Sequence, residues 1–337
     1  VRWKEDVVGL QGSLGLVSNL HPELVVHLER FDLADVREFA PAAPLKGVVS
    51  GDLALRGKLA DLRMAGVLTT EAGGRLDIVE AGVGLVKPLA HHLDVALTRF
   101  DLAEILDVPQ LPPPLTGAVR WTGTGRSPDT LQGDAVVDLA PVEYQKMLIG
   151  PTHLAARLQD WTVALKGSTV GLARGTVRPS GTVDLTRRCF NVRVGGGLGA
   201  LQDLRRRTSA PFTRGAATLD VTADGCWGTP ASVVALSSTA TVGLTGVALD
   251  AAGTSVRTGQ VTWDVTLDMP KEGSPQVHGP VSVGLAGLVV AKQVISTAMI
   301  DGALDGAAID FAAEVESGAD LGAELNGRVD WGSLPQE

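Results

Sequence analysis

The chain has 337 residues, of which 45% are hydrophobic and 4% aromatic, and its net charge is −9 at pH 7. The hydrophobic content excludes intrinsic disorder, and the acidic balance argues against non-specific nucleic-acid binding, which needs a cationic face. The 41 glycines argue against a helix-rich fold, because each interior glycine costs about 0.8–1 kcal/mol relative to alanine, and they follow no collagen-like triplet period.

No apolar stretch reaches the length of about 20 residues that a membrane-spanning helix needs. The longest uncharged apolar run near the C-terminus, at 279–291, is shorter. We find no secretion signal. The chain begins without a methionine, and we interpret it as a mature form or an excerpt, so the lack of an anchor carries little weight.

An unusual sequence segment, called the phrase below, occurs twice. FDLADVREFAPAAPLKG, which begins at Phe31, returns as FDLAEILDVPQLPPPLTG at Phe100, about 70 residues later. In this alignment Gly47 corresponds to Gly117. Each copy leads through prolines into alternating segments, and repeated units of this kind stack and bury surface on their neighbours. We therefore expect the phrase to be a joint between groups of strands.

Most of the chain alternates between apolar and polar residues. The pattern is clear in LKGVVSGDLALRGKL, which begins at Leu45, and it recurs in LQGDAVVDL, VTWDVTLDM, AIDFAAEV and AELNGRVDW. Strict alternation predicts half-buried strands. We count about fifteen to twenty of them. We expect antiparallel pairing, because parallel strands need long helical crossovers, and the chain has few helical patterns.

Short helices are expected only in GALQDLRRR at 199–207 and in parts of VREFA and AEILDV. The predicted organisation has three parts. They are β-repeats over 1–140, with copies at about 31–99 and 100–140, an irregular or diverged segment with a short helix over 141–214, and a diverged β-repeat region over 215–337.

The two cysteines leave two readings open. Cys189 and Cys226 can form one disulfide in an oxidising compartment or remain two buried thiols. No CxxC motif or histidine cluster supports a metal site. His91 and His92 are adjacent, so on a strand they would point to opposite faces and would not chelate together.

Motifs for chemistry are weak. Gly195-x-Gly197-x-x-Ala200 imitates a dinucleotide fingerprint, but the β–helix–β alternation that it needs is missing, and we interpret it as a glycine turn. GDLALRGKL has one residue too many between Gly51 and Gly57 for a phosphate loop. No GxSxG, HExxH or CxxC is present. We expect neither enzyme activity nor a cofactor.

The phrase and the strands after it, FDLADVREFAPAAPLKGVVSGDLALRGKLADLRMAGVL, resemble the AsmA-like family of Gram-negative envelope proteins, which includes TamB and YhdP. The second copy, FDLAEILDVPQLPPPLTGAVRWTGTGRSPDTLQGDAVV, is similar. The resemblance covers about 25–140 and is diffuse over 215–332. The resemblance is based on the repeated spacing of apolar residues, prolines and glycines, and on no catalytic residue. It implies an elongated, repetitive, mostly antiparallel sheet curled into a U-shaped hydrophobic groove, the β-taco of bridge-like lipid transfer proteins.

The resemblance also implies a function. We expect a periplasmic protein, anchored to the inner membrane in its full-length form, whose groove conducts phospholipids between the inner and outer membranes. An outer-membrane protein would be a further partner, and nucleic acid would not. The alternative is a structural scaffold that assists outer-membrane protein assembly through strand addition and carries no lipid.

If the groove exists, lipid acyl chains should lie along the inward-facing apolar residues, and no single residue should be essential. These residues are Leu45, Val49, Leu53, Leu55, Leu59, Leu62, Met64, Leu68, Leu76, Ile78, Leu93, Val95, Leu97, Val119, Trp121, Val137, Val261, Trp263, Val265, Leu267, Ile309 and Phe311.

Overall fold

The structure, a computed structural model, is almost entirely β, with 81% strand and 4% helix. It confirms the expected antiparallel all-β fold with few short helices. The residues that it describes are 2–3, 6–15, 21–38, 44–58, 60–84, 89–108, 112–125, 130–144, 147–204, 212–227, 233–249, 253–268, 276–306, 308–318 and 321–330.

The chain divides into two compact units. The first comprises Val1–Tyr144 and Pro151–Trp161, and the second comprises Gln145–Gly150 and Thr162–Glu337. The division lies close to the expected end of the first repeat region at 140. The expected boundary at 214 lies inside the second unit.

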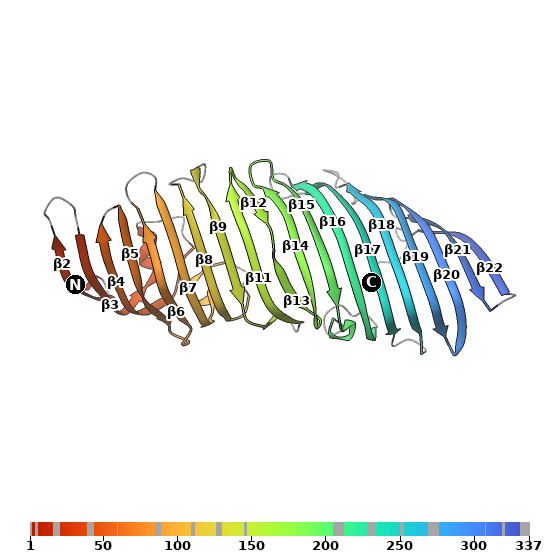
Figure 1. The fold of residues 1–337 in the computed structure, drawn as a ribbon, viewed down its shortest axis with the longest axis horizontal. Helices are drawn as coiled ribbons and strands as arrows, with labels where there is room; N and C mark the ends of the chain where they lie inside the picture. The colour runs from red at the N-terminus through yellow and green to blue at the C-terminus, as the bar shows by residue number, and fades with distance from the viewer. Residues whose placement is uncertain are drawn as a thin grey trace. The chain divides into compact units, whose positions relative to one another are not determined.

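The first unit is a meander in which each strand from β1 to β8 pairs antiparallel with the next, and β9 pairs with β11 (Figure 1). β11 belongs to this unit from Pro151 onward. The strands are β1 (Arg2–Trp3), β2 (Asp6–Gly15), β3 (His21–Asp32), β4 (Val48–Lys58), β5 (Asp61–Thr70), β6 (Arg75–Val83), β7 (Ala90–Phe100), β8 (Leu115–Thr124), β9 (Gln132–Leu139), β10 (Val142–Tyr144) and β11 (Met147–Gln159).

The repeated phrase has the same local structure in both copies. A short helix follows each phenylalanine, η1 (Leu33–Glu38) in the first copy and α1 (Leu102–Ile105) in the second. Before each helix, an aspartate carboxylate accepts a hydrogen bond of 2.9 Å from the backbone N–H two residues on. The two bonds are Ala34 to Asp32 and Ala103 to Asp101. Short polar side chains cap helix starts in this way.

The strand register corrects the sequence alignment of the two copies. Phe31 pairs with Val49, and Phe100 pairs with Leu115. Val49 is therefore the structural equivalent of Leu115, and the predicted correspondence of Gly47 with Gly117 is wrong. The reason is that the connection from the phenylalanine to the next strand is longer in the first copy, so the offset changes after the phenylalanine.

The two copies contact each other directly and form the predicted joint. Leu45 and Leu106 make an antiparallel bridge. The Lys46 N–H donates to the Ile105 carbonyl at 3.0 Å, and the Asp107 N–H donates to the Pro44 carbonyl at 2.7 Å. These backbone hydrogen bonds join the two copies of the phrase and are separate from the hydrogen bonds between the paired strands.

The second unit is also an antiparallel meander. β12 and β13 both pair with β14, and each strand from β14 to β21 pairs with the next. The strands are β12 (Thr162–Leu165), β13 (Thr169–Leu172), β14 (Gly175–Asp184), β15 (Cys189–Leu198), β16 (Phe212–Trp227), β17 (Val233–Leu249), β18 (Ser255–Asp268), β19 (Gln276–Val290), β20 (Gln293–Gly306), β21 (Ala308–Ser317) and β22 (Leu321–Asp330).

The segment 141–214 was expected to be irregular or diverged, and most of it is regular, because it forms β10 to β15. The glycine run that we interpreted as a turn lies inside β15. Glycines have no side chain to reveal alternation, which hid the C-terminal end of this strand in the sequence. The helix expected at 199–207 is reduced to the one-turn 3₁₀ helix η3 (Leu201–Asp203), and 205–207 lie outside the described residues.

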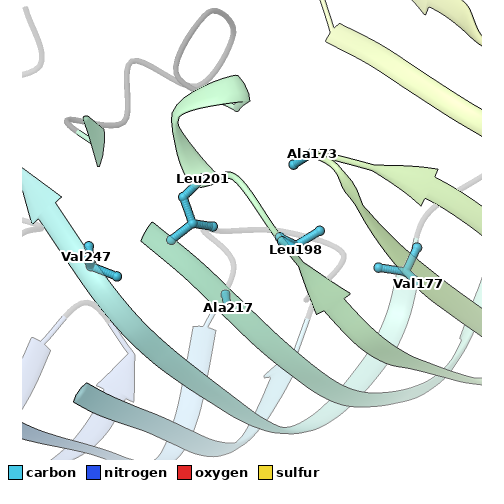
Figure 2. Close-up of a cluster of buried hydrophobic side chains, with 6 residues drawn as sticks. All are labelled: Ala173, Val177, Leu198, Leu201, Ala217 and Val247. Atoms are coloured by element: carbon cyan, nitrogen blue, oxygen red, sulfur yellow. The ribbon is translucent and has the colours of Figure 1, made fainter. Parts of the chain in front are cut away.

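A small core closes one end of the strands in the second unit. Figure 2 shows its six side chains, which come from the turn after β13, from β14 to β17 and from η3. Leu201 and Val247 are almost fully buried, with exposed fractions of 3% and 2%. Phe212 and Leu249 pack against the cluster. The six residues are Ala173, Val177, Leu198, Leu201, Ala217 and Val247.

Candidate functional site

The candidate site is an apolar face that runs across the strands of each unit. Directly opposed residues in an antiparallel sheet share a face, and successive residues along a strand alternate between faces. The register therefore defines rows of side chains across the sheet. In the first unit, one such row is Val26, Leu53, Gly66, Ile78, Val95, Val119, Val137 and Leu154. The neighbouring row is Leu24, Leu55, Met64, Ala81, Leu93, Trp121, Ala135 and Ala156.

The second unit has the same arrangement from β15 to β22. One row is Val194, Val221, Ala240, Trp263, Val281, Gly302, Phe311 and Gly327. The next row is Gly196, Leu219, Val242, Val261, Val283, Ile300, Ala313 and Leu325. The residues between these two rows point to the other face and are mostly short and polar. They are Gly195, Asp220, Thr241, Thr262, Ser282, Asp301, Ala312 and Asn326.

The register places the predicted groove residues together, with two exceptions. Leu59 lies outside the described residues. Leu45 precedes β4 and belongs to the joint. All the others lie on the apolar face of their unit. The sequence analysis named no groove residue on β3, although HPELVVHLERF alternates clearly, and none on β16 or β17, where alternating Thr and Ala weaken the hydrophobic contrast.

The apolar face remains partly open. Within each unit the described strands form one sheet, so no second sheet of described strands packs against this face. Most of its side chains are half-buried against their neighbours in the sheet. Toward the edge strand β22 they become exposed, with fractions of 37% for Ile300, 62% for Leu325 and 47% for Val329.

Both tryptophans in these rows have satisfied N–H groups. The Trp121 indole N–H donates to His91 Nδ1 at 2.7 Å, and the two rings stack with centroids 5.8 Å apart. A Cβ on Gly123 or Gly133 would approach Trp121 Cζ2 to 2.7 Å, so these glycines leave room for the indole. The Trp263 N–H donates to Ser238 Oγ at 3.2 Å. Each indole N–H donor is therefore already hydrogen-bonded, and only carbon surface of the indole is left to make apolar contacts.

The opposite face, called the polar face here, carries ion pairs between neighbouring strands, although in the first unit it also includes apolar residues such as Val25 and Ala54. Asp138 lies 2.6 Å from His153 Nδ1 and 2.9 Å from an Arg120 nitrogen. The hydrogen bond with His153, followed by the charges of His153 and Arg120, lowers the pKa of Asp138. Arg193 pairs with Asp220 at 2.6 Å, and the hydrogen bond lowers the pKa of that carboxyl. All these groups are exposed, so water screens their attraction.

Two hollows in the described part of the second unit lie over the polar face. The larger one, about 610 Å³, is lined mainly by short polar side chains such as Thr222, Thr239 and Thr262. Among the described residues, no group of three or more His, Cys, Asp and Glu side chains could hold a metal ion. No helix in the described ranges is long and apolar enough to span a membrane.

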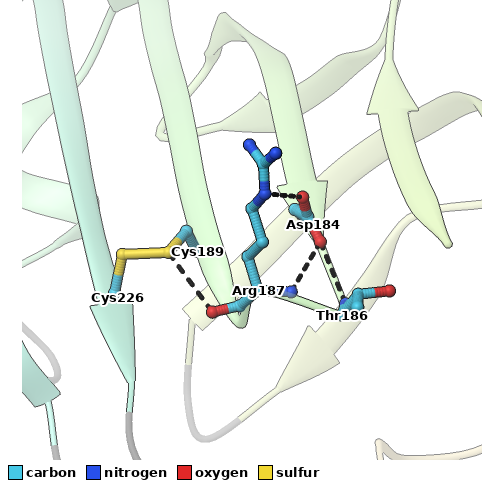
Figure 3. The surroundings of a disulfide bond; sticks show 5 residues. All are labelled: Asp184, Thr186, Arg187, Cys189 and Cys226. Carbon is cyan, nitrogen blue, oxygen red and sulfur yellow. Dashed lines mark hydrogen bonds and ion pairs between the residues drawn. A yellow bond between two sulfur atoms is a disulfide. The ribbon is translucent and has the colours of Figure 1, made fainter.

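A disulfide joins Cys189 and Cys226, which face each other on β15 and β16 (Figure 3). The turn that leads into β15 is fixed by Asp184, whose carboxylate accepts from the N–H groups of Thr186 at 2.9 Å and Arg187 at 2.7 Å. Disulfides between neighbouring strands persist in oxidising compartments and are rare in a reducing cytosol.

No protein-family model, curated protein or solved structure matches this chain. The resemblance to the AsmA-like family stays a prediction from the sequence, and the function has to be argued from the apolar face.

Proposed function

We propose that the apolar face of each unit binds the acyl chains of phospholipids, and that the chain is a segment of a hydrophobic β groove through which phospholipids pass between the inner and outer membranes. One observation carries the proposal. Both units present rows of half-exposed aliphatic side chains across successive strands, without a charged side chain in the rows described above.

The dimensions suit an acyl chain. The apolar positions of β15 extend from Phe190 to Leu198, which at about 3.3 Å per residue is about 26 Å. One leaflet of a bilayer is about half of the 30 Å hydrocarbon thickness. Each methylene removed from water contributes about 0.8 kcal/mol, so a face with many weak contacts can hold a lipid without any essential residue.

The location is part of the same proposal. The Cys189–Cys226 disulfide supports an oxidising compartment such as the periplasm. An anchor in the inner membrane and a partner at the outer membrane would come from outside the described residues. The proposal needs no catalytic group and no cofactor.

The scaffold alternative is favoured by one feature, the edge strand β22. Leu325 and Val329 of this strand are exposed, and an uncovered edge can accept a strand from another protein. Under this alternative the apolar face would pack against protein and would carry no lipid.

One experiment distinguishes lipid binding from the scaffold function. The purified chain is examined by native mass spectrometry, and lipids are extracted and identified from the same sample. We expect co-purifying phospholipid that is lost in a Leu55→Asp, Val265→Asp variant, because a carboxylate among acyl chains has no partner for its charge. The matched control is Ala54→Asp, Thr266→Asp, which places the same charges on the polar face one residue away.

Equal lipid retention by both variants, with circular dichroism showing intact strands, would contradict the proposal. A stable wild-type chain without lipid would favour the scaffold.

A further inference from the structure

The outer edge of β22 has no strand beside it among the residues that the structure describes. β22 pairs with β21 on one side only, and it is the last strand of the second unit in Figure 1. All of its residues from Gly322 to Asp330 are exposed. The open edge of a strand presents unpaired backbone N–H and C=O groups, and it can therefore pair with a further strand.

The two faces of β22 differ in chemistry. Leu325 and Val329 lie on the apolar face and are 62% and 47% exposed. Glu324 and Arg328 alternate with them and lie on the polar face. A strand that pairs with this edge has to offer apolar side chains on one face and complementary charges on the other.

The charges of β22 are only half matched by β21. Arg328 lies opposite Asp310, and its Nη1 is 2.9 Å from a carboxylate oxygen of that residue. Glu324, in contrast, lies opposite a second carboxylate, Glu314. Like charges directly opposite each other on neighbouring strands are destabilising. A cation on the outer side of Glu324 would offset this repulsion.

We propose that the outer edge of β22 pairs antiparallel with the same edge of a second copy of this chain, and that the two-fold axis passes through Asn326. In this register Glu324 lies opposite the partner's Arg328, and Leu325 lies opposite the partner's Gly327. A two-fold axis repeats every contact, so both charge pairs form twice.

The charges select this axis. An axis between two residues would place the apolar face of one copy beside the polar face of the other. With the axis at Leu325, Glu324 lies opposite the partner's Asn326, and no opposite charges face each other. With the axis at Gly327, Glu324 lies opposite the partner's Asp330, which repels it. Of these three central axes, only the one through Asn326 brings opposite charges together.

The apolar face fits the same axis. Gly327 lies opposite Phe311 on β21, and a Cβ on Gly327 would be 2.8 Å from Phe311 Cζ. The Phe311 ring therefore extends over Gly327 toward the outer edge of β22. The partner's Leu325 lies on the other side of Gly327 and contacts this ring. The exposed surface of both leucines is thereby removed from water.

The pairing also joins the apolar faces of the two copies. The axis is perpendicular to the sheet, so the apolar faces of both second units lie on the same side. The row that ends with Phe311 and Gly327 continues into the partner's Leu325. The interface itself needs no lipid, so its test is independent of the proposed function.

Sedimentation equilibrium of the purified 337-residue chain measures the association. We expect a weak, reversible dimer, because a single pair of strands is a small interface. Glu324→Arg would place arginines opposite each other, and Arg328→Glu would place glutamates opposite each other. Each variant alone should raise the dissociation constant about tenfold, which corresponds to 1.4 kcal/mol, because attractive contacts become repulsive.

A mixture of the two variants separates lost pairing from misfolding. The arginine introduced by Glu324→Arg lies opposite the glutamate introduced by Arg328→Glu, so the mixture should form heterodimers about as tightly as the wild-type chain. The control is Asp301→Arg, the same charge reversal at an exposed residue of the polar face on β20. It should leave the dissociation constant unchanged.

Cysteine crosslinking tests the position of the axis. Asn326→Cys should form a disulfide between copies, because directly opposed residues of an antiparallel pair have Cα atoms about 4.5–5.5 Å apart. Leu325→Cys should crosslink more slowly, since it faces the partner's Gly327. Faster crosslinking of Leu325→Cys would overturn the proposed axis. A wild-type chain that stays monomeric, assemblies larger than a dimer, or a mixture of the charge variants that does not associate would overturn the interface.

Discussion

At the scale of single residues, exposed ion pairs set how the polar face titrates. His27 and Asp52 lie opposite each other on β3 and β4 and are hydrogen-bonded. This bond, followed by the charge of Asp52, raises the pKa of His27 above 6.5. A raised histidine pKa means that the pair stabilises the fold fully below the unfolded-state pKa, and that this contribution is lost as the pH rises through the folded-state pKa.

We predict that His27 titrates above 6.5 in the folded protein and that Asp52→Asn moves its pKa back down. An NMR titration of the imidazole signals measures both values. Glu29→Gln is the control, because the charge of Glu29 raises the pKa of His27 least among its causes. A His27 pKa that does not respond to Asp52→Asn would contradict the pairing.

The sequence predicts the face of a residue better than its partner. Alternation placed Trp121 among the apolar residues, and the register agrees. The hydrogen bond to His91 and the space left by Gly123 and Gly133 depend on β7 and β9. Those strands were predicted without a register, so neither interaction could be foreseen.

At the scale of elements, the joint between the two repeats depends on a close backbone approach. Gly47 has a φ of +79°, and a Cβ there would lie 2.1 Å from the Glu104 carbonyl oxygen. Gly47→Ala should therefore force the two copies apart and lower the free energy of unfolding by about 1–3 kcal/mol. The midpoint of urea unfolding measures the change.

Gly73→Ala is the matched control. Gly73 also has a positive φ, +85°, but a Cβ there would meet nothing within 4 Å. Both variants bear the conformational strain, and only Gly47→Ala adds the collision. Equal losses of stability would mean that the contact between the copies contributes nothing.

Strands were predictable where side chains alternate visibly and less so elsewhere. β4, β18 and β21 follow alternation that the sequence displays. CFNVRV, the first part of β15, looks strand-like in the sequence, but the rest of the strand was taken for a turn because three of its residues are consecutive glycines. The residue offset between the two repeats was misjudged because the length of the connecting loop does not change the alternation within the strands. The pairing of each phenylalanine with the following strand was needed to find it.

At the scale of the whole molecule, each described strand contacts mainly the strands beside it, so stability should be local in the manner of repeat proteins. The Cys189–Cys226 disulfide closes a sequence separation of 37 residues in the second unit. Cys189→Ser, Cys226→Ser should destabilise its surroundings by about 2–4 kcal/mol. Amide hydrogen exchange should then accelerate in β14 to β17 and stay unchanged in β3 to β8.

Reduction of the wild-type disulfide should reproduce the same pattern and should have no effect on the double variant. Faster exchange throughout both units would show instead that the chain unfolds as one cooperative block. That result would also bear on the proposed groove. A lipid-binding face built from locally stable strands can lose one segment and keep its other apolar rows, whereas a single cooperative block would lose all of them together.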